Sequence, residues 1–330
     1  MTETSRDLGV GVRPRIIVVG NANVDVVLGS VTPWPTPGTE VTADNFELRV
    51  GGAAGNTALA LAALGVEEGL DSEVVAGVGD DALGRWLETA LSGAARLSKV
   101  PRTTAMTVCL THPDAQRTFV SYLGHLESMP LARLLDTLAL SRPGDLLLLC
   151  GYFLLPELRT AAQDLLVEAR SRGVITLLDT GWPSEGWTAA VRAEIGRLLP
   201  LLDAFLPNRD EVLGAAGLCS EADSQEAVAE LLGMGTARVI VKLEAEGALM
   251  ASATEMVQVP APTVTVQDTV GAGDTFNAGL LAGLQSGLDW PAALSRAVTA
   301  ASLTVASSPR RYPSLAEVQA ANSAAAQLTG

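Results

Sequence analysis

The feature that most constrains the fold is an alternation of short apolar runs with helix-like segments in the second half of the chain. The apolar runs cover residues 146–150, 174–178, 204–206 and 239–243. Such an alternation is typical of repeated βαβ units, so we expect a mostly parallel sheet covered by helices. No internal repeat, low-complexity tract or long linker interrupts this half.

The remaining segments complete this α/β domain. We expect it to comprise residues 15–27, 51–102 and 125–330, after a flexible N-terminus over residues 1–14. With 330 residues, of which 48% are hydrophobic, such a domain can bury a large core. The apolar run at 16–19 is too short for a signal core or a membrane span, so no export signal is expected.

Two strand-rich pieces interrupt the domain. Residues 28–50 contain several prolines and show no helical period, and residues 103–124 hold two strand-like runs around the turn-like His112, Pro113 and Asp114. We expect the two pieces to pair as a small β lid. An uncovered face of such a sheet invites association, so a homodimer joined through the lids is expected. Apolar residues such as Val108, Leu110, Phe119 and Val120 would be exposed on at least one face of the lid if it were left unpaired.

The stretch DTVGAGDTFNAGLL, residues 268–281, combines a glycine turn, a carboxylate and a helix start. A helix is expected to begin near Gly273, and its free N–H groups and dipole would form an anion site. Asp274 lies at the mouth of this site. It is either an ordinary charge favoured by the helix dipole or a base that takes a proton from a hydroxyl attacking a bound anion. The residues alone leave both interpretations open.

A polar row follows the first apolar run. Asn21, Asn23 and Asp25 fall at period two, on one face of the strand expected over 15–27. They are either Asx side chains that bond local backbone at a strand end or part of a binding site.

A glycine pair lies a short distance further along. Gly51 and Gly52 precede a helix whose expected N-cap is Asn56. Adjacent glycines also allow a ligand to approach the backbone closely, so a turn with a helix cap is an incomplete account of this stretch.

These stretches resemble the ribokinase/PfkB family of carbohydrate kinases, whose C-terminal signature of Asp, small residues and Gly-Ala-Gly-Asp is matched nearly throughout 268–281. The resemblance implies a ribokinase-like three-layer αβα sandwich with a mainly parallel central sheet and a small β lid. It also implies an ATP-dependent kinase that phosphorylates a hydroxyl of a sugar or related polyol, with nucleosides and sugar acids included.

The resemblance also implies roles for individual residues. The phosphoryl-holding turn and the catalytic base of the family fall on Gly271, Ala272, Gly273 and Asp274. The sugar-binding residues of the family fall on Asn23, Asp25, Gly51, Gly52 and Asn56.

The nucleotide side is less complete. Asn208 and Glu211 have the spacing of a capping box, which is a sufficient structural account. The resemblance places the same motif near Mg²⁺ and the phosphates, with Glu211 acting on the metal through water. Residues 241–250 correspond to a nucleotide-binding turn in which Gly247 matches the family but Glu244 replaces a glycine. The implied nucleotide contacts are Asn208, Lys242, Gly247, Gly271 and Gly273, with ATP and Mg²⁺ as cofactors.

The tail carries a second departure from the family. Residues 304–313 lack the glycine that is common where relatives build a monovalent-cation site, so activation by K⁺ is not implied. Arg310 and Arg311 are interpreted as solvated charges.

Two other functions are compatible with parts of the sequence. Gly77, Gly79 and Ala82 satisfy a loose dinucleotide-binding spacing, but the acidic residue expected about 20 positions beyond the first glycine is missing. An NAD-dependent oxidoreductase is therefore weakly indicated, and Asp80 and Asp81 are expected to cap the following helix. Because Glu244 departs from the family, a catalytically silent sugar or nucleotide sensor also remains open. The chain contains no Walker A loop, Gly-x-Ser-x-Gly elbow or His-Glu-x-x-His motif.

Composition excludes several classes of partner. The formal charge is −15, with 22 basic residues, of which only Lys99 and Lys242 are lysines, so neither nucleic acid nor an anionic membrane is an expected partner. The three cysteines are widely scattered and fit neither a disulfide framework nor paired metal-ligand spacing, so a cytoplasmic location is expected. A surface or hairpin role is expected for the two histidines, His112 and His125.

The expected substrate is an unphosphorylated sugar or nucleoside other than ribose. Ribokinases carry a glutamate where this chain has Gly151, which would remove a hydroxyl acceptor and leave room for a bulkier ligand walled by Tyr152 or Phe153. A second phosphate would need local cations, and only Arg49 and Arg117 fall within the lid pieces.

Overall fold

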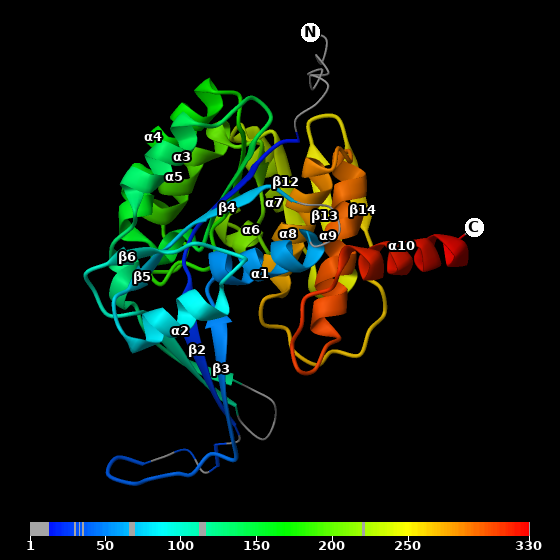
Figure 1. The fold of residues 1–330 in the computed structure, drawn as a ribbon. Coiled ribbons are helices and arrows are strands. Elements are labelled where there is room, and N and C mark those ends of the chain that lie inside the picture. The colour runs from blue at the N-terminus through cyan, green and yellow to red at the C-terminus, as the bar shows by residue number, and fades with distance from the viewer. Residues whose placement is uncertain are drawn as a thin grey trace.

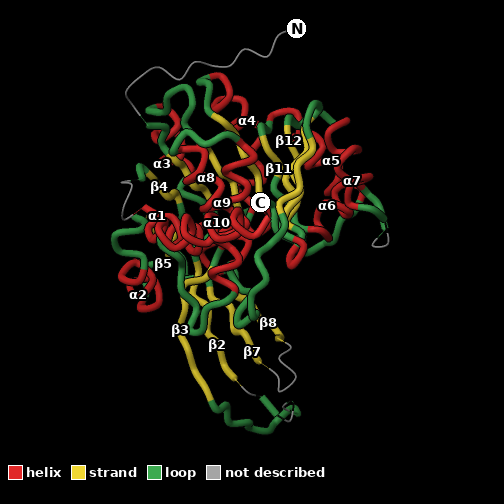
Figure 2. Tube along the Cα trace, turned by 90° about the vertical axis from the view of Figure 1, so that its right-hand side faces the viewer, coloured by secondary structure: helices red, strands yellow, loops and turns green. Residues whose placement is uncertain are grey.

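A computed structural model describes residues 13–29, 31–32, 34, 36–65, 70–111, 117–219 and 222–329. The turn expected at His112, Pro113 and Asp114, and nearly all of the expected flexible N-terminus, lie outside these residues. The described chain forms a central sheet between two layers of helices, with a second, smaller sheet projecting from one end (Figures 1 and 2).

The central sheet has eight strands and is mostly parallel. Only its last two strands pair antiparallel. In spatial order the strands are β14 (Met256–Val259), β13 (Ala248–Ser252), β12 (Arg238–Lys242), β11 (Ala204–Phe205), β10 (Ile175–Asp179), β9 (Leu146–Cys150), β1 (Ile16–Val19) and β4 (Ser72–Val75). The parallel sheet predicted from the alternation of apolar runs is confirmed.

Helices cover both faces of this sheet, which confirms the predicted αβα sandwich. One layer consists of α3 (Leu131–Ala139), α4 (Pro156–Ser171), α5 (Ala189–Leu198), α6 (Arg209–Ala216) and α7 (Ser224–Gly233). The other is built from α1 (Ala53–Gly65), α8 (Ala272–Gln285) and α9 (Trp290–Val305), with α2 (Ala82–Ala90) and α10 (Leu315–Thr329) at its margins. Successive residues of β1 enter opposite cores, Ile17 one and Ile16 the other, because a strand covered on both faces must be apolar throughout.

The smaller sheet is the lid. Figure 2 shows the strands of this sheet running away from the body of the protein. Their order is β3 (Asn45–Gly51), β2 (Asn23–Gly29), β7 (Met106–Thr111) and β8 (Arg117–Tyr122). The antiparallel pairing of β7 with β8 agrees with the hairpin expected in 103–124.

The lid begins earlier in the chain than expected. The single strand predicted over 15–27 is two strands in different sheets, so residues 23–27 lie in the lid rather than in the main domain. The break has a physical cause at Asn21. Its side-chain Oδ1 accepts from Ala53 N at 3.1 Å and its carbonyl accepts from Ala54 N at 3.0 Å, so this residue caps α1 and cannot continue the strand ladder.

Short elements fill the remaining connections. β5 (Gly77–Gly79) pairs parallel with β6 (Ser98–Val100), and four 3₁₀ turns cover Gly124–Glu127, Tyr152–Leu154, Leu199–Leu201 and Glu244–Glu246. The surface role expected for His125 is wrong. Its side chain is fully buried, and Nδ1 accepts from Ala105 N at 2.8 Å just before β7 begins. Among the described residues, none of the helices is both long enough and apolar enough to span a bilayer.

Candidate active site

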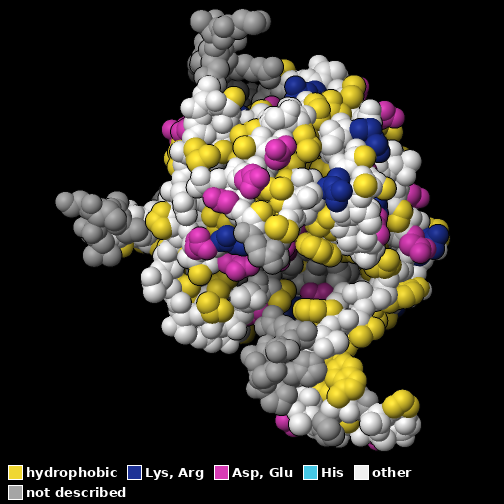
Figure 3. Space-filling model, turned by 180° about the vertical axis from the view of Figure 1, so that it is seen from behind, with side chains coloured by type: hydrophobic (Ala, Val, Ile, Leu, Met, Phe, Trp, Pro, Cys, Tyr) yellow, Lys and Arg dark blue, Asp and Glu magenta, His cyan; other side chains and the backbone are white. Residues whose placement is uncertain are grey.

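The carboxyl ends of the central strands face the lid, and the predicted site residues gather between them. In open α/β sheets this edge is the usual place for ligands. Seen from behind, the surface is hollowed between the body and the lid, and basic side chains are scattered over this face rather than gathered in a stripe (Figure 3).

The glycine turn leads directly into α8. Gly271 has φ 81°, a left-handed conformation that side chains rarely adopt, and it forms the N-cap of the helix. Thr275 Oγ1 donates to the carbonyl of Gly271 at 2.9 Å and so steadies the turn from inside the first helical turn. A Cβ added to Gly273 would lie 3.6 Å from Lys242 Nζ, so the lysine approaches the turn closely. Helix dipole, first-turn N–H groups and lysine together favour an anion here.

Asp274 lies in the first turn of α8. Its Oδ2 accepts from Asn56 Nδ2 at 2.8 Å. Burial, followed by the negative charge of Asp179, raises the pKa of Asp274 to about 7, although Asn56, Lys242 and Arg310 oppose the rise. A carboxylate that only complements a helix dipole would have its pKa lowered. A pKa near neutrality is what a general base requires.

A buried polar cluster lies beneath the turn. Lys242 Nζ is 2.8 Å from Asp179 Oδ2, and Asn277 Nδ2 donates to the same oxygen at 2.6 Å. Burial works against the charge of Lys242, but Asp179 and Glu211 outweigh it and raise the lysine pKa. The pKa of Glu211 rises to about 7, because of burial first and Asp179 second.

The capping box predicted at α6 is confirmed. Asn208 N donates to Glu211 Oε2 and Glu211 N donates to Asn208 Oδ1, both at 2.9 Å. Asn208 also forms a parallel bridge with Lys242, so the box lies beside the polar cluster. Within the described ranges no group of three or more His, Cys, Asp or Glu residues is placed to hold a metal directly. Carboxylates around a single lysine nevertheless suit a hydrated Mg²⁺ that arrives with phosphate ligands.

The polar row of the lid is connected by hydrogen bonds. Asn21 Nδ2 donates to Asn23 Oδ1 at 3.1 Å, and Asn23 Nδ2 donates to Asp25 Oδ1 at 2.8 Å. Burial raises the pKa of Asp25 to about 6, against the charge of Arg310 and the bond from Asn23. A Cβ at Gly51 would collide with the Asp25 carboxylate, and one at Gly52 would lie 2.5 Å from the Asn21 carbonyl. The glycine pair is therefore required by the close packing of this row.

The sequence predicts Asn56 as the N-cap of α1, and this prediction is wrong. The helix begins at Ala53 and Asn21 caps it, so Asn56 lies inside its first turn. The Asn56 side chain joins two other segments instead: it donates to Asp274, and its Oδ1 accepts from Tyr312 Oη at 3.0 Å. It therefore links the glycine pair, the expected base and the chain's tail.

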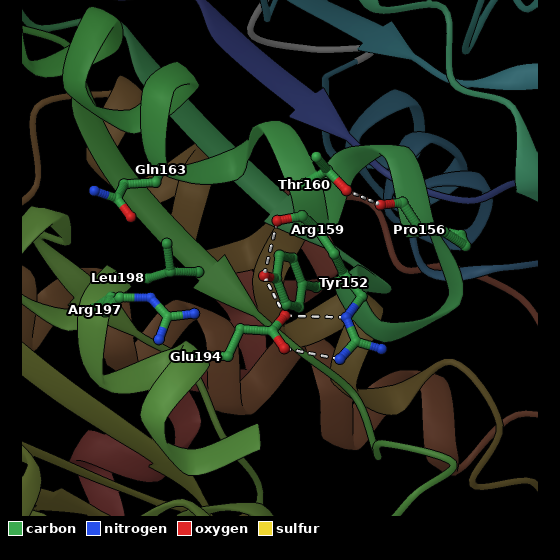
Figure 4. A pocket seen from close by; sticks show the side chains of 8 residues that line it. All are labelled: Tyr152, Pro156, Arg159, Thr160, Gln163, Glu194, Arg197 and Leu198. Carbon is green, nitrogen blue, oxygen red and sulfur yellow. Dashed lines mark hydrogen bonds and ion pairs between the residues drawn. The ribbon is translucent and has the colours of Figure 1, made fainter. Parts of the chain in front are cut away.

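The prediction that Tyr152 or Phe153 forms an aromatic wall beside the substrate is wrong. Tyr152 is fully buried, and its hydroxyl donates to Glu194 Oε1 at 2.7 Å in a pocket between α4 and α5 (Figure 4). Phe153 packs against Trp187 at 5.6 Å, in the core on the opposite face of the sheet from α8. Gly151 leaves no room for a ligand either. It has φ 61°, and a Cβ there would collide with Asn21 Oδ1.

The departure at Glu244 leaves the backbone turn intact. Glu244 has φ 54° and is the sole non-glycine residue with positive φ in the described chain. This conformation favours glycine, and Glu244 adopts it with an exposed side chain. Gly247 also has positive φ, and a Cβ there would collide with the Val259 carbonyl.

The dinucleotide-like glycines have structural roles. Gly79 lies in β5, where a Cβ would collide with the backbone of Thr104. Asp81 caps α2 as expected: its Oδ1 accepts from Gly84 N at 2.8 Å. Asp80 does not cap the helix and instead forms an ion pair with Lys99 at 3.0 Å.

Sequence reasoning missed several residues of the site. Asp179 and Tyr312 carried no motif, and Asn277, although it lies within the stretch 268–281, was given no role. The expectation that Arg310 is a solvated charge is wrong. Arg310 donates to the carbonyls of Val50 and Val270, at 3.1 and 3.3 Å. The local signal for Asp179 was its position at the end of an apolar run, where parallel strands place functional side chains.

Comparison with known proteins fits this geometry. The family model described as pfkB family carbohydrate kinase matches residues 13–315. A protein of Escherichia coli (strain K12) named as the uncharacterized sugar kinase YegV is 31% identical over 290 residues, covering 84% of each chain. A 1-phosphofructokinase of Haloferax volcanii is 37% identical over 184 residues, covering 49% of this chain and 60% of that protein.

Solved structures agree as well. The structure of Arabidopsis thaliana ribokinase complexed with ribose and ATP matches with a TM-score of 0.80 at 25% identity, covering 94% of this chain and 99% of that chain. The ribokinase-like fold predicted from the sequence is confirmed.

Gly151→Ala tests whether the Asn21 side chain fixes this part of the site. An alanine at residue 151 must adopt the left-handed backbone conformation, and its Cβ must also displace Asn21 Oδ1. We therefore expect the free energy of unfolding, measured by urea denaturation, to fall by about 2–4 kcal/mol. Gly186→Ala is the matched control, because Gly186 has φ 69° but nothing within 4 Å of an added Cβ. Equal losses in the two variants would show that Asn21 moves aside freely.

Proposed function

Because the chain belongs to the pfkB family of carbohydrate kinases, we propose that it transfers the γ-phosphoryl group of ATP to a hydroxyl of a sugar or related polyol, with Asp274 as the base. One observation carries the proposal. Asp274 directly follows the glycine turn at the start of α8, accepts a hydrogen bond from Asn56 of α1, and has a pKa raised to about 7.

The residues divide the work as follows. Asn23, Asp25 and Asn56, with the backbone at Gly51 and Gly52, would orient the sugar hydroxyls. Asp274 would accept the proton of the attacking hydroxyl as its oxygen bonds to the γ-phosphorus and the bond to the β-phosphate oxygen breaks, with ADP leaving. The N–H groups of the turn Gly271, Ala272 and Gly273 would receive the charge that develops on the transferring group.

The nucleotide would lie on the other side of the turn. Asn208, Lys242 and the turn at Gly247 would bind it, with the lysine charge directed to the phosphates. Mg²⁺ bound with ATP would neutralise phosphate charge, and Glu211 would hold its water shell. A role for K⁺ is not part of the proposal. A cytoplasmic location is part of it, because ATP is available there and the cysteines Cys109, Cys150 and Cys219 would stay reduced.

The substrate proposed is an unphosphorylated sugar or nucleoside for which ribose is not the best choice. Tyr152 and Phe153 are buried and offer the substrate no aromatic wall, but the placement of the basic side chains still disfavours a second phosphate. Arg49 is committed to Asp268 and Glu47, and Arg310 to two carbonyls, so neither guanidinium is directed to a second phosphate.

A substrate panel tests this proposal. ADP formation from Mg²⁺-ATP should be measured with free pentoses, hexoses, ketoses, sugar acids, nucleosides and sugar phosphates. We expect the highest kcat/KM among the unphosphorylated compounds other than ribose. A preference for ribose or for a sugar phosphate would contradict the substrate assignment, and binding of sugar or nucleotide without turnover would instead favour the sensor.

Asp274→Asn should keep the fold and the nucleotide affinity but slow the chemical step by a factor of about 10² to 10⁴, the usual contribution of a positioned base. In free energy this is about 3–5 kcal/mol. ADP formation with the preferred sugar measures the loss. Glu226→Gln is the control, since Glu226 is another carboxylate in the first turn of a helix, α7, and is exposed outside the site. Full activity in Asp274→Asn would remove Asp274 from the mechanism.

The pH profile checks the same assignment in the wild type. A base must be deprotonated to act, and the pKa of Asp274 is raised to about 7, so kcat/KM should fall as the pH drops through that value. Asp274→Asn should lose this acidic limb while keeping its low residual rate.

We also propose a homodimer in which the lids of two copies pack face to face. Strand register places Phe46, Val108, Leu110, Val120 and Tyr122 on one face of the lid. Phe46, Val120 and Tyr122 are more than half exposed, at 63%, 59% and 54%. An apolar sheet face of this kind is suited to a second copy.

The register divides the expected apolar residues between the two faces of the lid. Phe119 pairs with Cys109 and lies on the opposite side of the sheet, although it is also exposed. Val120→Lys should therefore dissociate the dimer in sedimentation experiments at micromolar concentration, whereas Phe119→Ser should not. Wild-type protein that sediments only as a monomer would contradict the dimer.

A further inference from the structure

Arg310 lies in the tail between α9 and α10 and joins two segments that are far apart in the sequence. Its Nη2 donates to the carbonyl of Val50 at 3.1 Å, and its Nη1 donates to the carbonyl of Val270 at 3.3 Å. Each carbonyl belongs to the residue immediately before a functional glycine: Val50 precedes Gly51, and Val270 precedes Gly271. One guanidinium therefore holds the glycine pair of the sugar side against the glycine turn of the phosphoryl side.

A second arginine joins the same two segments but uses its charge differently. Arg49 Nη1 is 2.5 Å from Asp268 Oδ2, and Nη2 is 2.6 Å from Glu47 Oε2, so its charge is neutralised by carboxylates. Arg310 binds neutral carbonyls, and within the described chain it forms no ion pair. Its positive charge therefore acts on the site itself. A Cβ added to Gly271 would lie 3.3 Å from its Nη1.

We propose that Arg310 is a positioning residue for phosphoryl transfer, which aligns the two glycine turns and places a permanent positive charge beside Asp25 and Asp274. The proposal rests on the proposed kinase function. Arg310 would then be the second residue of the tail with a role in the site, after Tyr312, which donates a hydrogen bond to Asn56.

The side chain suits this task because a guanidinium is planar and carries several N–H donors at fixed angles, whereas a lysine ammonium is a compact point charge on a flexible stem. Arginine can thus donate to two carbonyls at once and keep both segments in one geometry. Displacing reacting groups by about 1 Å can cost on the order of 10²-fold in rate.

The charge of Arg310 has a separate, measurable effect. It lowers the pKa of both Asp25 and Asp274, against the larger effect of burial, which raises them. The other charged or titratable groups that act on Asp274 or feel its charge are Asp179 on β10, Lys242 on β12, Cys150 on β9 and Tyr312 in the tail. Removing Arg310 leaves these groups in place, so the pKa of Asp274 should rise and the acidic limb of kcat/KM should move to higher pH.

Three variants separate alignment from charge. In Arg310→Ala we expect kcat to fall about 10- to 100-fold, with the acidic limb at higher pH. In Arg310→Lys we expect a smaller fall in kcat and a limb at its wild-type position, because the charge is kept and one carbonyl contact is lost. Arg311→Ala is the matched control: Arg311 is the neighbouring residue, is exposed and pairs with Glu317 at 2.8 Å, and its loss should change neither quantity.

Hydrogen exchange supplies a readout that does not depend on turnover. Arg310→Ala should speed amide exchange in residues 51–56 and 271–275 together, with little change in the central strands, whereas Arg311→Ala should leave both segments unchanged. Wild-type kinetics with unchanged exchange in Arg310→Ala would overturn the proposal, as would faster exchange throughout the protein, which would indicate a general structural role. If the wild type phosphorylates no sugar, the kinase function fails, and the exchange experiment still decides whether Arg310 aligns the two turns.

Discussion

The candidate active site holds several carboxylates together with very little positive charge. Asp179, Glu211 and Asp274 meet at the carboxyl edge of the sheet, and Lys242, one of two lysines in the chain, is the cation placed among them. Lys242 and Asn277 both bind Asp179, so this carboxylate is the fixed member of the group. Its negative charge, added to burial, raises the pKa values of the other two. Basicity at Asp274 is therefore a property of the cluster and not of the helix N-terminus.

Asn21 plays a comparable role for the fold. It stands where the chain leaves the central sheet for the lid, caps α1 with its side chain and carbonyl, and donates to Asn23. These contacts consume the space around it, which is why Gly52 and Gly151 cannot carry a side chain there. The glycine pair that binds substrate in the proposed function is thus first a consequence of how the chain turns between two sheets.

The parts of the structure that were predictable are those set by local sequence. Alternating apolar runs gave the parallel sheet, and the glycine turn and capping box lie within a few residues of their partners. The failures involve contacts between distant segments. Asn56 meets Asp274 across 218 positions and Tyr312 across 256, and no local pattern reports such pairs.

The same reasoning explains two errors at single residues. Tyr152 has the apolar surroundings of a pocket wall in sequence, but Glu194 on α5 draws its hydroxyl to the opposite side of the sheet. Arg310 resembles its neighbour Arg311 in sequence, yet one binds the carbonyls of the two glycine turns and the other a surface glutamate. The two neighbouring arginines thus have different partners because the two glycine turns lie beside Arg310 only.

The connection between lid and body follows from chain continuity. Strand β3 carries Arg49, ends at Gly51 and leads through Gly52 into α1, which carries Asn56. The lid strand, the glycine pair and the residue that hydrogen-bonds to Asp274 are therefore consecutive parts of one segment. Arg49 and Asn56, which both belong to this segment, contact Asp268 just before α8 and Asp274 within it. A movement of β3 relative to the body must therefore alter either the Arg49–Asp268 ion pair or the Asn56–Asp274 hydrogen bond. Lid position and the orientation of Asp274 are consequently coupled without any intermediate element, so in the proposed function water exclusion and alignment of the base would belong to one geometric state.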